Sequence, residues 1–405
     1  MEHDHSIGER ICYYRRRFGL SQVACADLVG RSESWLSQVE RGLLPIDRVS
    51  VLLKLAHVLR VELADLLGPA LKLPPNGGGP GKLPQGVPAV RRAIMRPDGL
   101  GETADVERFD AVEVTRRVEA ANQAVTTYGR YTQVALMLPD LIGICRAAAQ
   151  AFEGRDQEVA WGLLAKSYQL ASVLSRKLGD AALAWIAADR ACSAAERSGD
   201  EVLVGSSVGR LIAALMLAGQ MDDAEALASE RILRLGRGLD TAGPERVSTW
   251  GAFMLAAAIC AARRDDPASC RERLHEASSA ARLLPDGYVD GWTLFCPTNV
   301  ALHEVHAAHD VGDPVEALRL ADQVDFDAMP SPQRRARTWI DVARAHGLRR
   351  NDAAAVVTLL VAEQAGPEEV RYHGAVQDLV RVLLRRERKS ATPGLRALAE
   401  RISVE

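Results

Sequence analysis

The sequence predicts an all-α protein in which a small N-terminal helical domain is tethered to a long C-terminal stack of helix pairs. Of its 405 residues, 48% are hydrophobic but only 5% are aromatic, and alanine dominates the apolar count. That mixture favours close-packed helices, because strands are enriched in aromatic and β-branched side chains. Two further observations support this architecture: a glycine- and proline-rich segment interrupts the chain, and turn signals recur at regular intervals after it.

The composition excludes several classes of protein. A net charge of −3 is incompatible with a globally basic nucleic-acid coat, although it allows a small basic-faced domain. The seven cysteines are odd in number and scattered, so we expect reduced thiols rather than a disulfide framework or a zinc cluster. The acidic start of the chain lacks a signal peptide's apolar run, and no stretch approaches about eighteen uninterrupted apolar residues. We therefore expect a cytoplasmic protein that does not cross a membrane.

The N-terminal domain, residues 1–67, has the boundary signals of five short helices. Ser6 and Glu9 form a capping box, and Ser32 caps the third helix. The expected helices cover residues 6–18, 20–30, 33–40, 48–59 and 62–67, with further boundary signals at Gly19, Gly30, Arg41–Gly42, Pro45 and Asp47. The expected core comprises Ile11, Val23, Leu28, Leu36, Val39, Leu52, Leu55 and Ala56. A tight turn between the second and third helices is the arrangement that presents one helix to a DNA major groove.

The segment LSQVACADLVGRSESWLSQVERG, residues 20–42, resembles the helix-turn-helix family of phage repressors and xenobiotic-response-element-type regulators. Ser21-Gln22 opens the second helix, a glycine stands in the turn, and Ser37 to Gly42 closes the third helix as in that family. The resemblance implies a transcriptional regulator of an actinobacterial type, which binds a double-stranded operator as a homodimer. The alternative is a helical domain that has lost DNA binding and serves only for docking.

The resemblance also implies DNA-contacting residues. It assigns this role to Gln22, Ser32, Glu33, Ser34, Ser37, Gln38, Arg41, Arg48 and Arg17. Gln22 would hold a phosphate and brace the recognition helix, whereas Glu33 would accept from cytosine and Gln38 would bridge adenine. The arginines would hold phosphates, which set the register without reading the sequence. Trp35 is interpreted as a packing residue rather than a thymine-methyl contact.

A linker separates the two domains. Residues 68–88 contain six glycines and six prolines in twenty-one positions, a composition that favours neither helix nor strand. We therefore expect a tether between residues 1–67 and a body of residues 89–405.

The body has a repeating pattern of helices and turns. Turn signals occur at Leu178-Gly179-Asp180, Ser198-Gly199-Asp200, Ala218-Gly219-Gln220, Arg264-Asp265-Asp266, Val311-Gly312-Asp313 and Arg350-Asn351-Asp352. When the turn at Gly199 is left out, consecutive turns lie about 40 to 47 residues apart, which is typical of stacked helix pairs. Residues 145–388 resemble a degenerate tetratricopeptide-repeat solenoid, and residues 89–144 are expected to form a helix pair that caps the stack. An irregular helical bundle is the alternative.

The resemblance to a solenoid implies a concave face that binds a small molecule, a peptide or a protein. Asn299, His303, His306 and Asp310 share one polar helix face. The candidate ligand-binding residues are Arg210, Trp250, Phe253, Trp292, Asn299, His303, His306 and Arg337, and Phe295 is expected to overhang the groove beside Trp292. The alternative is that these residues form solvated faces and packing contacts. Asparagines that would clamp a peptide are scarce in the body, so a small hydrophobic signal or a protein partner is favoured.

No motif of an enzyme, metal site or cofactor site is evident. The histidines of residues 303–309 lie too far around the helix for one ion to join all three. We therefore expect a non-enzymatic regulator without a cofactor, with a role in secondary metabolism or development suggested by the family resemblance. The alternative is an adaptor whose solenoid binds a protein and whose DNA binding is secondary.

Overall fold

The computed structural model describes residues 7–17, 20–42, 49–59, 61, 66, 83–96, 106–107, 109–387 and 392–404. The chain divides into two compact units, Met1–Pro75 and Asn76–Glu405. Every regular element in these described ranges is helical, which confirms the predicted all-α class. We call the two parts the N-terminal unit and the body, and describe each by itself.

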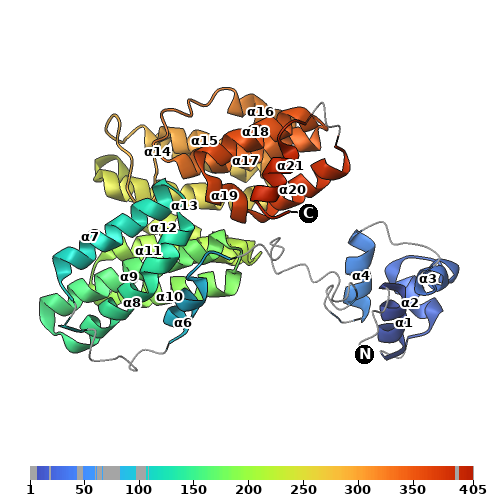
Figure 1. Cartoon of the computed structure of the whole chain (residues 1–405), viewed down its shortest axis with the longest axis horizontal. Coiled ribbons are helices and arrows are strands. Elements are labelled where there is room, and N and C mark those ends of the chain that lie inside the picture. Colours follow the sequence, from blue (N-terminus) through green and yellow to red (C-terminus); the bar gives the residue numbers. More distant parts are fainter. Residues whose placement is uncertain are drawn as a thin grey trace. The chain divides into compact units, whose positions relative to one another are not determined.

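The described helices of the N-terminal unit are α1 (Ile7–Arg17), α2 (Gln22–Val29), α3 (Glu33–Glu40) and α4 (Val49–Leu59) (Figure 1). Ser21 caps α2 by accepting a hydrogen bond from the backbone of Ala24, and Ser32 caps α3 in the same way. Gly30 takes the left-handed conformation, with φ 76°, that ends α2 and turns the chain toward α3. The predictions at Ser6, Phe18, Gly19, Pro45, Asp47, Arg48 and the fifth helix, apart from Leu66, lie outside the described residues.

The core of the N-terminal unit differs from the predicted one in α2. Ile11, Leu36, Val39, Leu55 and Ala56 are buried as predicted. Val23 and Leu28 are 48% and 62% exposed, so their assignment to the core was wrong. The core-facing side of α2 consists of Cys25, Ala26 and Val29, and at 100° per residue Val23 and Leu28 lie about 110° to either side of it. The burial of Leu52 lies outside what the structure describes.

The body is a succession of paired helices. Its α-helices are α6 (Val87–Met95), α7 (Ala111–Asn122), α8 (Tyr131–Ala151), α9 (Gly154–Lys177), α10 (Ala181–Ser198), α11 (Glu201–Leu217), α12 (Met221–Leu235), α13 (Pro244–Arg263), α14 (Pro267–Ala281), α15 (Pro297–Asp310), α16 (Pro314–Ala321), α17 (Pro332–Leu348), α18 (Asp352–Ala365), α19 (Pro367–Tyr372), α20 (Gly374–Arg385) and α21 (Leu395–Arg401). A π-helical turn, Gln123–Thr127, follows α7, and a 3-10 turn, Leu239–Thr241, follows α12. Since α6 begins at Val87, the last two residues of the predicted linker belong to a helix.

The predicted turns lie where consecutive helices meet. Five of them join the members of the pairs α9–α10, α11–α12, α13–α14, α15–α16 and α17–α18, and the turn at Gly199 joins two pairs. In the five intra-pair turns the chain takes a positive φ, at Gly179, Gly219, Asp265, Gly312 and Arg350. The following helix is capped by Asp180, Asp266, Asp313 or Asn351, except α12, whose N-cap Gln220 makes no side-chain bond. Residues 89–144 differ from the expected pair, because they include α7 and parts of both α6 and α8, and α8 packs against α9.

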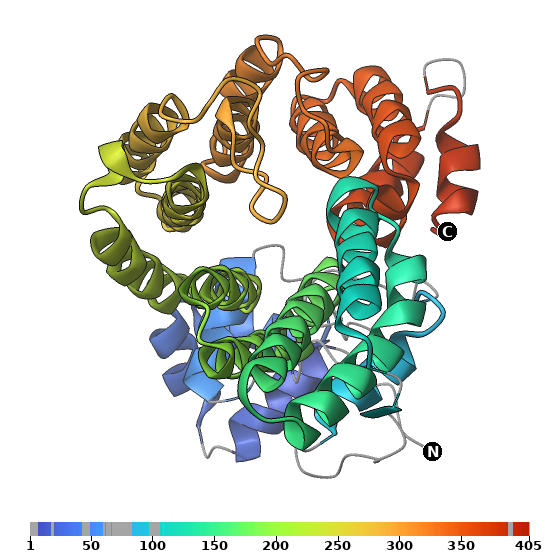
Figure 2. The same ribbon diagram turned by 90° about the vertical axis from the view of Figure 1, so that its left-hand side faces the viewer.

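The body closes on itself. Tyr131, at the start of α8, donates a hydrogen bond to the carboxylate of Glu369 in α19. The backbone N–H of Thr132 donates to Glu368 over 2.9 Å, and Ser331 Oγ donates to the carbonyl of Thr126 over 2.8 Å. Figure 2 shows the resulting ring, with α7 in teal beside the red C-terminal helices. The helix pairs therefore surround a central space instead of leaving an open concave edge.

Helix α8 is the single described helix that is long and apolar enough to cross a membrane, judged by length and composition alone. Most of its apolar window, 61%, is buried inside the body. It packs against α6, α7 and α9. This burial is the environment of a core helix.

Gly251 and Phe295 form a tight contact in the core of the body. Phe295 is fully buried, so the expectation that it overhangs the groove was wrong. A Cβ atom on Gly251 would lie 2.0 Å from Cζ of the Phe295 ring. The loop before α15 is therefore anchored to α13 by an aromatic ring that requires a glycine opposite it.

Substitution Gly251→Ala is expected to lower the free energy of unfolding by about 2 kcal/mol, because the buried ring must shift. The intrinsic gain in helix propensity, about 1 kcal/mol, offsets only part of this strain. Denaturation in urea measures the difference. Gly162→Ala in α9 is the matched control, since its Cβ would meet its first neighbour at 3.7 Å, and equal stability of the two variants would contradict the prediction.

Candidate functional site

The first candidate site is the outer face of α3 in the N-terminal unit. Glu33, Ser34, Gln38 and Arg41 are exposed and Ser37 is half-buried, whereas Leu36, Val39 and Glu40 are buried on the other side. At 100° per residue the five outer residues span an arc of about 140°. The structure thus brings these predicted DNA-contacting residues onto one polar surface, with Ser32 capping the helix at its start.

A buried polar network holds α3 against α1 and α2. Nε and Nη2 of Arg15 donate to the two carboxylate oxygens of Glu40, over 2.5 and 2.8 Å. Nε2 of Gln22 donates to Glu40 over 2.8 Å, so this residue takes the bracing position that the resemblance implies. Burial favours a neutral Glu40, but the hydrogen bonds from Arg15 and Gln22 outweigh it and lower the pKa of this carboxyl. The network therefore fixes the orientation of the outer face through a charged hydrogen-bonded pair.

Arg15, Glu40 and Arg31 were not among the site residues predicted from the sequence. Arg31 is exposed in the turn before α3, and its guanidinium lies 5.5 Å from the ring centre of the half-buried Trp35. Arg17 is exposed and donates to Tyr13 Oη over 3.3 Å. Arg48 lies outside the described residues. Arg31 could have been predicted, because it is a basic residue next to the N-cap serine of α3. The pairing of Arg15 with Glu40 could not, because the two residues are 25 positions apart in the sequence.

The second candidate site is a cavity of about 460 Å³ inside the body. It is lined chiefly by the first helix of each pair, α9, α11, α13, α15 and α17. Seven of the eight candidate ligand-binding residues line it: Arg210, Phe253, Trp292, Asn299, His303, His306 and Arg337. Trp250 does not, because its ring is buried in the core and Nε1 donates to the carbonyl of Ile232 over 3.1 Å. The predicted helix faces thus converge on one cavity, with Trp250 as the exception.

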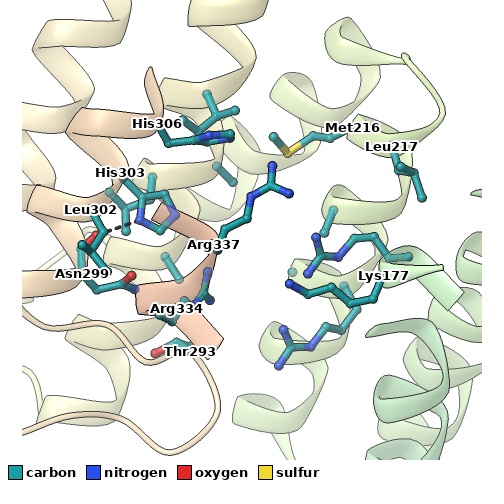
Figure 3. A pocket seen from close by; sticks show the side chains of 18 of the residues that line it. Lys177, Met216, Leu217, Thr293, Asn299, Leu302, His303, His306, Arg334 and Arg337 are labelled. Carbon is teal, nitrogen blue, oxygen red and sulfur yellow. Dashed lines mark hydrogen bonds between the residues drawn. The ribbon is translucent and has the colours of Figure 1, made fainter. Parts of the chain in front are cut away.

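The cavity wall carries an excess of positive charge. Among the residues that the structure describes, two carboxylates line it, those of Asp341 and Glu369. Six cationic side chains line it as well: Arg176, Lys177, Arg210, Arg263, Arg334 and Arg337. Figure 3 shows Arg337 extending into the space between the two walls, with Lys177 reaching toward it from the opposite wall. Four of these residues were not predicted from the sequence: Arg176, Lys177, Arg334 and Glu369. Arg176 and Lys177 lie in the last turn of α9, where basic residues commonly interact with the helix dipole. Nothing in the neighbouring sequence indicates that they face a cavity.

Several of these charges are paired. Lys177 Nζ lies 2.7 and 2.9 Å from the oxygens of Glu369, and Arg263 Nε lies 2.7 Å from Oδ2 of Asp310. Asp341 Oδ2 contacts His306 Nδ1 at 2.8 Å and Arg337 Nε at 3.9 Å. Burial alone would raise the pKa of Asp341, but His306 and Arg337 outweigh it and hold that pKa well below its usual range. Asp341 therefore stays ionised and organises the side chains around it.

His303 serves as a neutral hydrogen-bonding group on this wall. Burial, with the nearby charge of Arg334, lowers the pKa of His303 to about 3. His303 Nδ1 lies 2.8 Å from the carbonyl of Asn299, so Nδ1 carries the proton and donates. Among the described residues, no group of three histidine, cysteine or acidic side chains is arranged to hold a metal ion.

Comparison with known proteins identifies the N-terminal unit. Residues 6–67 match the family profile described as a helix-turn-helix domain. No curated protein matches the chain. Among solved structures, the chain is similar to a mutant of PrgX, with 11% sequence identity and a TM-score of 0.26 over 91% of this chain and 99% of that chain. The chain therefore carries a helix-turn-helix domain at its N-terminus, followed by a body of paired helices.

Proposed function

We propose that the protein is a sequence-specific transcriptional regulator of the xenobiotic-response-element type. It reads operator DNA through the outer face of α3 and senses a small effector in the cavity of the body. The observation that carries the proposal is the helix-turn-helix match over residues 6–67, together with the polar outer face that the Arg15–Glu40–Gln22 network holds in place. In this proposal the protein acts in the cytoplasm, on double-stranded operator DNA, and catalyses no reaction.

The proposed complex is a homodimer on a pseudo-palindromic operator. Two recognition helices would then enter successive major grooves about 34 Å apart. Regulators of this kind in actinobacteria suggest control of secondary metabolism or development. An effector of the body changes DNA binding only if it prefers one arrangement of the dimer over the other.

Binding selection from genomic fragments with the full-length protein tests this function. The expected result is a palindromic site bound at least about a thousandfold better than random DNA. Salt titration of both complexes separates phosphate contacts from base readout. Equal, weak and salt-suppressed binding to all fragments would instead support the adaptor function, in which the body binds a protein.

Substitution Gln38→Ala is expected to weaken binding to the selected site by about 1–3 kcal/mol and to relax selectivity at one base pair. Gln38 is exposed, so its removal leaves the fold of the N-terminal unit intact. Repeating the fragment selection with the variant measures the effect. Gln220→Ala, an exposed glutamine of the body, is the matched control, and an identical selected site for Gln38→Ala would contradict base readout by this residue.

A further inference from the structure

Three arginines of the cavity have no carboxylate partner among the residues that the structure describes. They are Arg176 in α9, Arg210 in α11 and Arg334 in α17, and we call them the arginine triad. Arg210 Nη2 donates to the carbonyl of Trp292 over 3.0 Å, which leaves its charge uncompensated. The Nε atoms of Arg210 and Arg334 are buried without a hydrogen-bond partner. Three different helices thus place guanidinium groups without an ion-pair partner at one cavity.

The triad is electrostatically unfavourable as it stands. Burial, followed by the charge of Arg176, lowers the pKa of both Arg210 and Arg334 to about 10. Burial also lowers the pKa of Arg176 itself. A lowered pKa means that the surroundings disfavour the protonated guanidinium group. Arginine nevertheless stays protonated in a protein, so the cavity holds positive charges that are not neutralised. Such an arrangement is relieved when an anion enters.

The carboxylates of the cavity are not free to neutralise the triad. Glu369 is bound by Lys177, by Gln333 Nε2 at 3.0 Å and by the hydroxyl of Tyr131. Asp341 is bound by His306. Neither described carboxylate of the cavity therefore supplies the negative charge that the triad lacks.

The other residues of the cavity wall indicate what kind of molecule the cavity accommodates besides an anionic group. Apolar side chains of α11 and α13, Leu217, Phe253, Ala256 and Ile259, line the cavity beside the triad. Asn299 also lines the cavity, and its Oδ1 is buried without a hydrogen-bond partner, so this oxygen is available to a ligand hydroxyl or amine. A volume of about 460 Å³ lies within the range of sites for small organic molecules.

We propose that the cavity binds a small amphipathic organic anion, whose carboxylate or phosphate group lies between Arg176, Arg210 and Arg334 and whose apolar part lies against α11 and α13. Guanidinium groups bind both kinds of oxyanion through paired N–H donors. This inference rests on the proposed sensing role of the body, and it differs from the small hydrophobic signal or protein partner that the sequence favours.

Anion binding to the full-length protein without DNA tests the site. Anilinonaphthalene sulfonate, an aromatic anion, reports binding by fluorescence, and its uncharged analogue N-phenyl-naphthylamine reports the contribution of the charge. Competition with pyrophosphate and with succinate distinguishes a phosphate ligand from a carboxylate ligand. We expect saturable binding of the anionic probe, weakened at least about tenfold in Arg176→Gln and in Arg334→Gln. Arg155→Gln, an exposed position on the same helix as Arg176, is the control and is expected to bind like the native protein.

Thermal unfolding separates a ligand site from a structural role. Without an anion, Arg176→Gln and Arg334→Gln are expected to raise Tm by about 2 °C, because one repelling charge is removed. A structural arginine would instead lower Tm when replaced. Absence of saturable anion binding, or native affinity in both triad variants, overturns the proposal.

The two proposals fail in different ways. Anion binding by a protein that selects no operator supports the site and refutes the regulator. Operator selection by a protein that binds no anionic probe refutes the site and leaves the regulator. Anion binding that leaves operator affinity unchanged supports the site and refutes only its sensing role.

Discussion

Substitution Glu369→Leu is expected to destabilise the body by about 3–5 kcal/mol. Glu369 is 2% exposed and accepts hydrogen bonds from groups on α8, α9 and α17. Its removal leaves Lys177 without its counter-ion inside a cavity that already carries excess positive charge. Urea denaturation followed by tryptophan fluorescence measures the loss, because five of the six tryptophans lie in the body.

The control for this substitution is Glu400→Leu, an exposed glutamate in α21. The double variant Lys177→Met with Glu369→Leu is expected to recover much of the stability, since both charges are then absent. Equal stability of Glu369→Leu and Glu400→Leu would contradict the structural role of Glu369.

The pH dependence of the native protein follows from the same carboxyl. Burial alone would raise the pKa of Glu369, but Lys177, His373 and Arg337 outweigh it and hold that pKa well below its usual range. Glu369 therefore contributes its full stabilisation at a pH above the pKa of a glutamate in the unfolded chain, about 4.3. This contribution is lost progressively as the pH falls from that value toward the lower pKa of the folded state. The stability of Glu369→Leu is accordingly expected to fall less steeply than that of the native protein in this acidic range.

Substitution Arg15→Met is expected to unfold the N-terminal unit and abolish operator binding, although Arg15 faces away from the outer surface of α3. Arg15 and Glu40 are each 7% exposed, and breaking such a buried pair costs about 3–5 kcal/mol. A unit of this size has little stability in reserve. Hydrogen exchange over residues 7–59 measures the unfolding, and a binding assay on the selected operator measures the functional loss.

Arg17→Met is the control on the same helix. Arg17 is exposed, so its replacement is expected to leave hydrogen exchange unchanged and to weaken DNA binding evenly over all sequences, as the loss of a phosphate contact does. Native exchange and native operator affinity in Arg15→Met would show that the buried network is dispensable.

Local signals in the sequence predicted the helix boundaries well. Turns such as Leu178-Gly179-Asp180 depend on a residue that tolerates positive φ and a side chain that caps the next helix, and both properties are local. Which side chains of a helix face the core was less predictable. Val23, Leu28 and Trp250 are apolar residues in amphipathic helices, and only the positions of neighbouring helices decide which apolar residue is buried in the core and which is not.

The cavity was predictable only in part, because some of its lining follows from spacing within one helix and the rest does not. The polar stripe of Asn299, His303 and His306 follows from spacing along α15. The triad does not, because Arg176 and Arg334 come together only through the closure of the ring by contacts such as Tyr131 with Glu369, 238 residues apart. No periodicity within one helix encodes a contact over that distance.

Ring closure also changes how the body is expected to lose its structure. In a linear repeat protein each unit is stabilised by its neighbours, and the terminal units, with one neighbour each, fray first. Here the start of α8 and the short helix α19 are neighbours, so two segments that would be ends of the array support each other. Fraying from one end therefore removes support from the other. We therefore expect the body to unfold as one cooperative unit, and the contacts between α8 and α19 to couple its two halves.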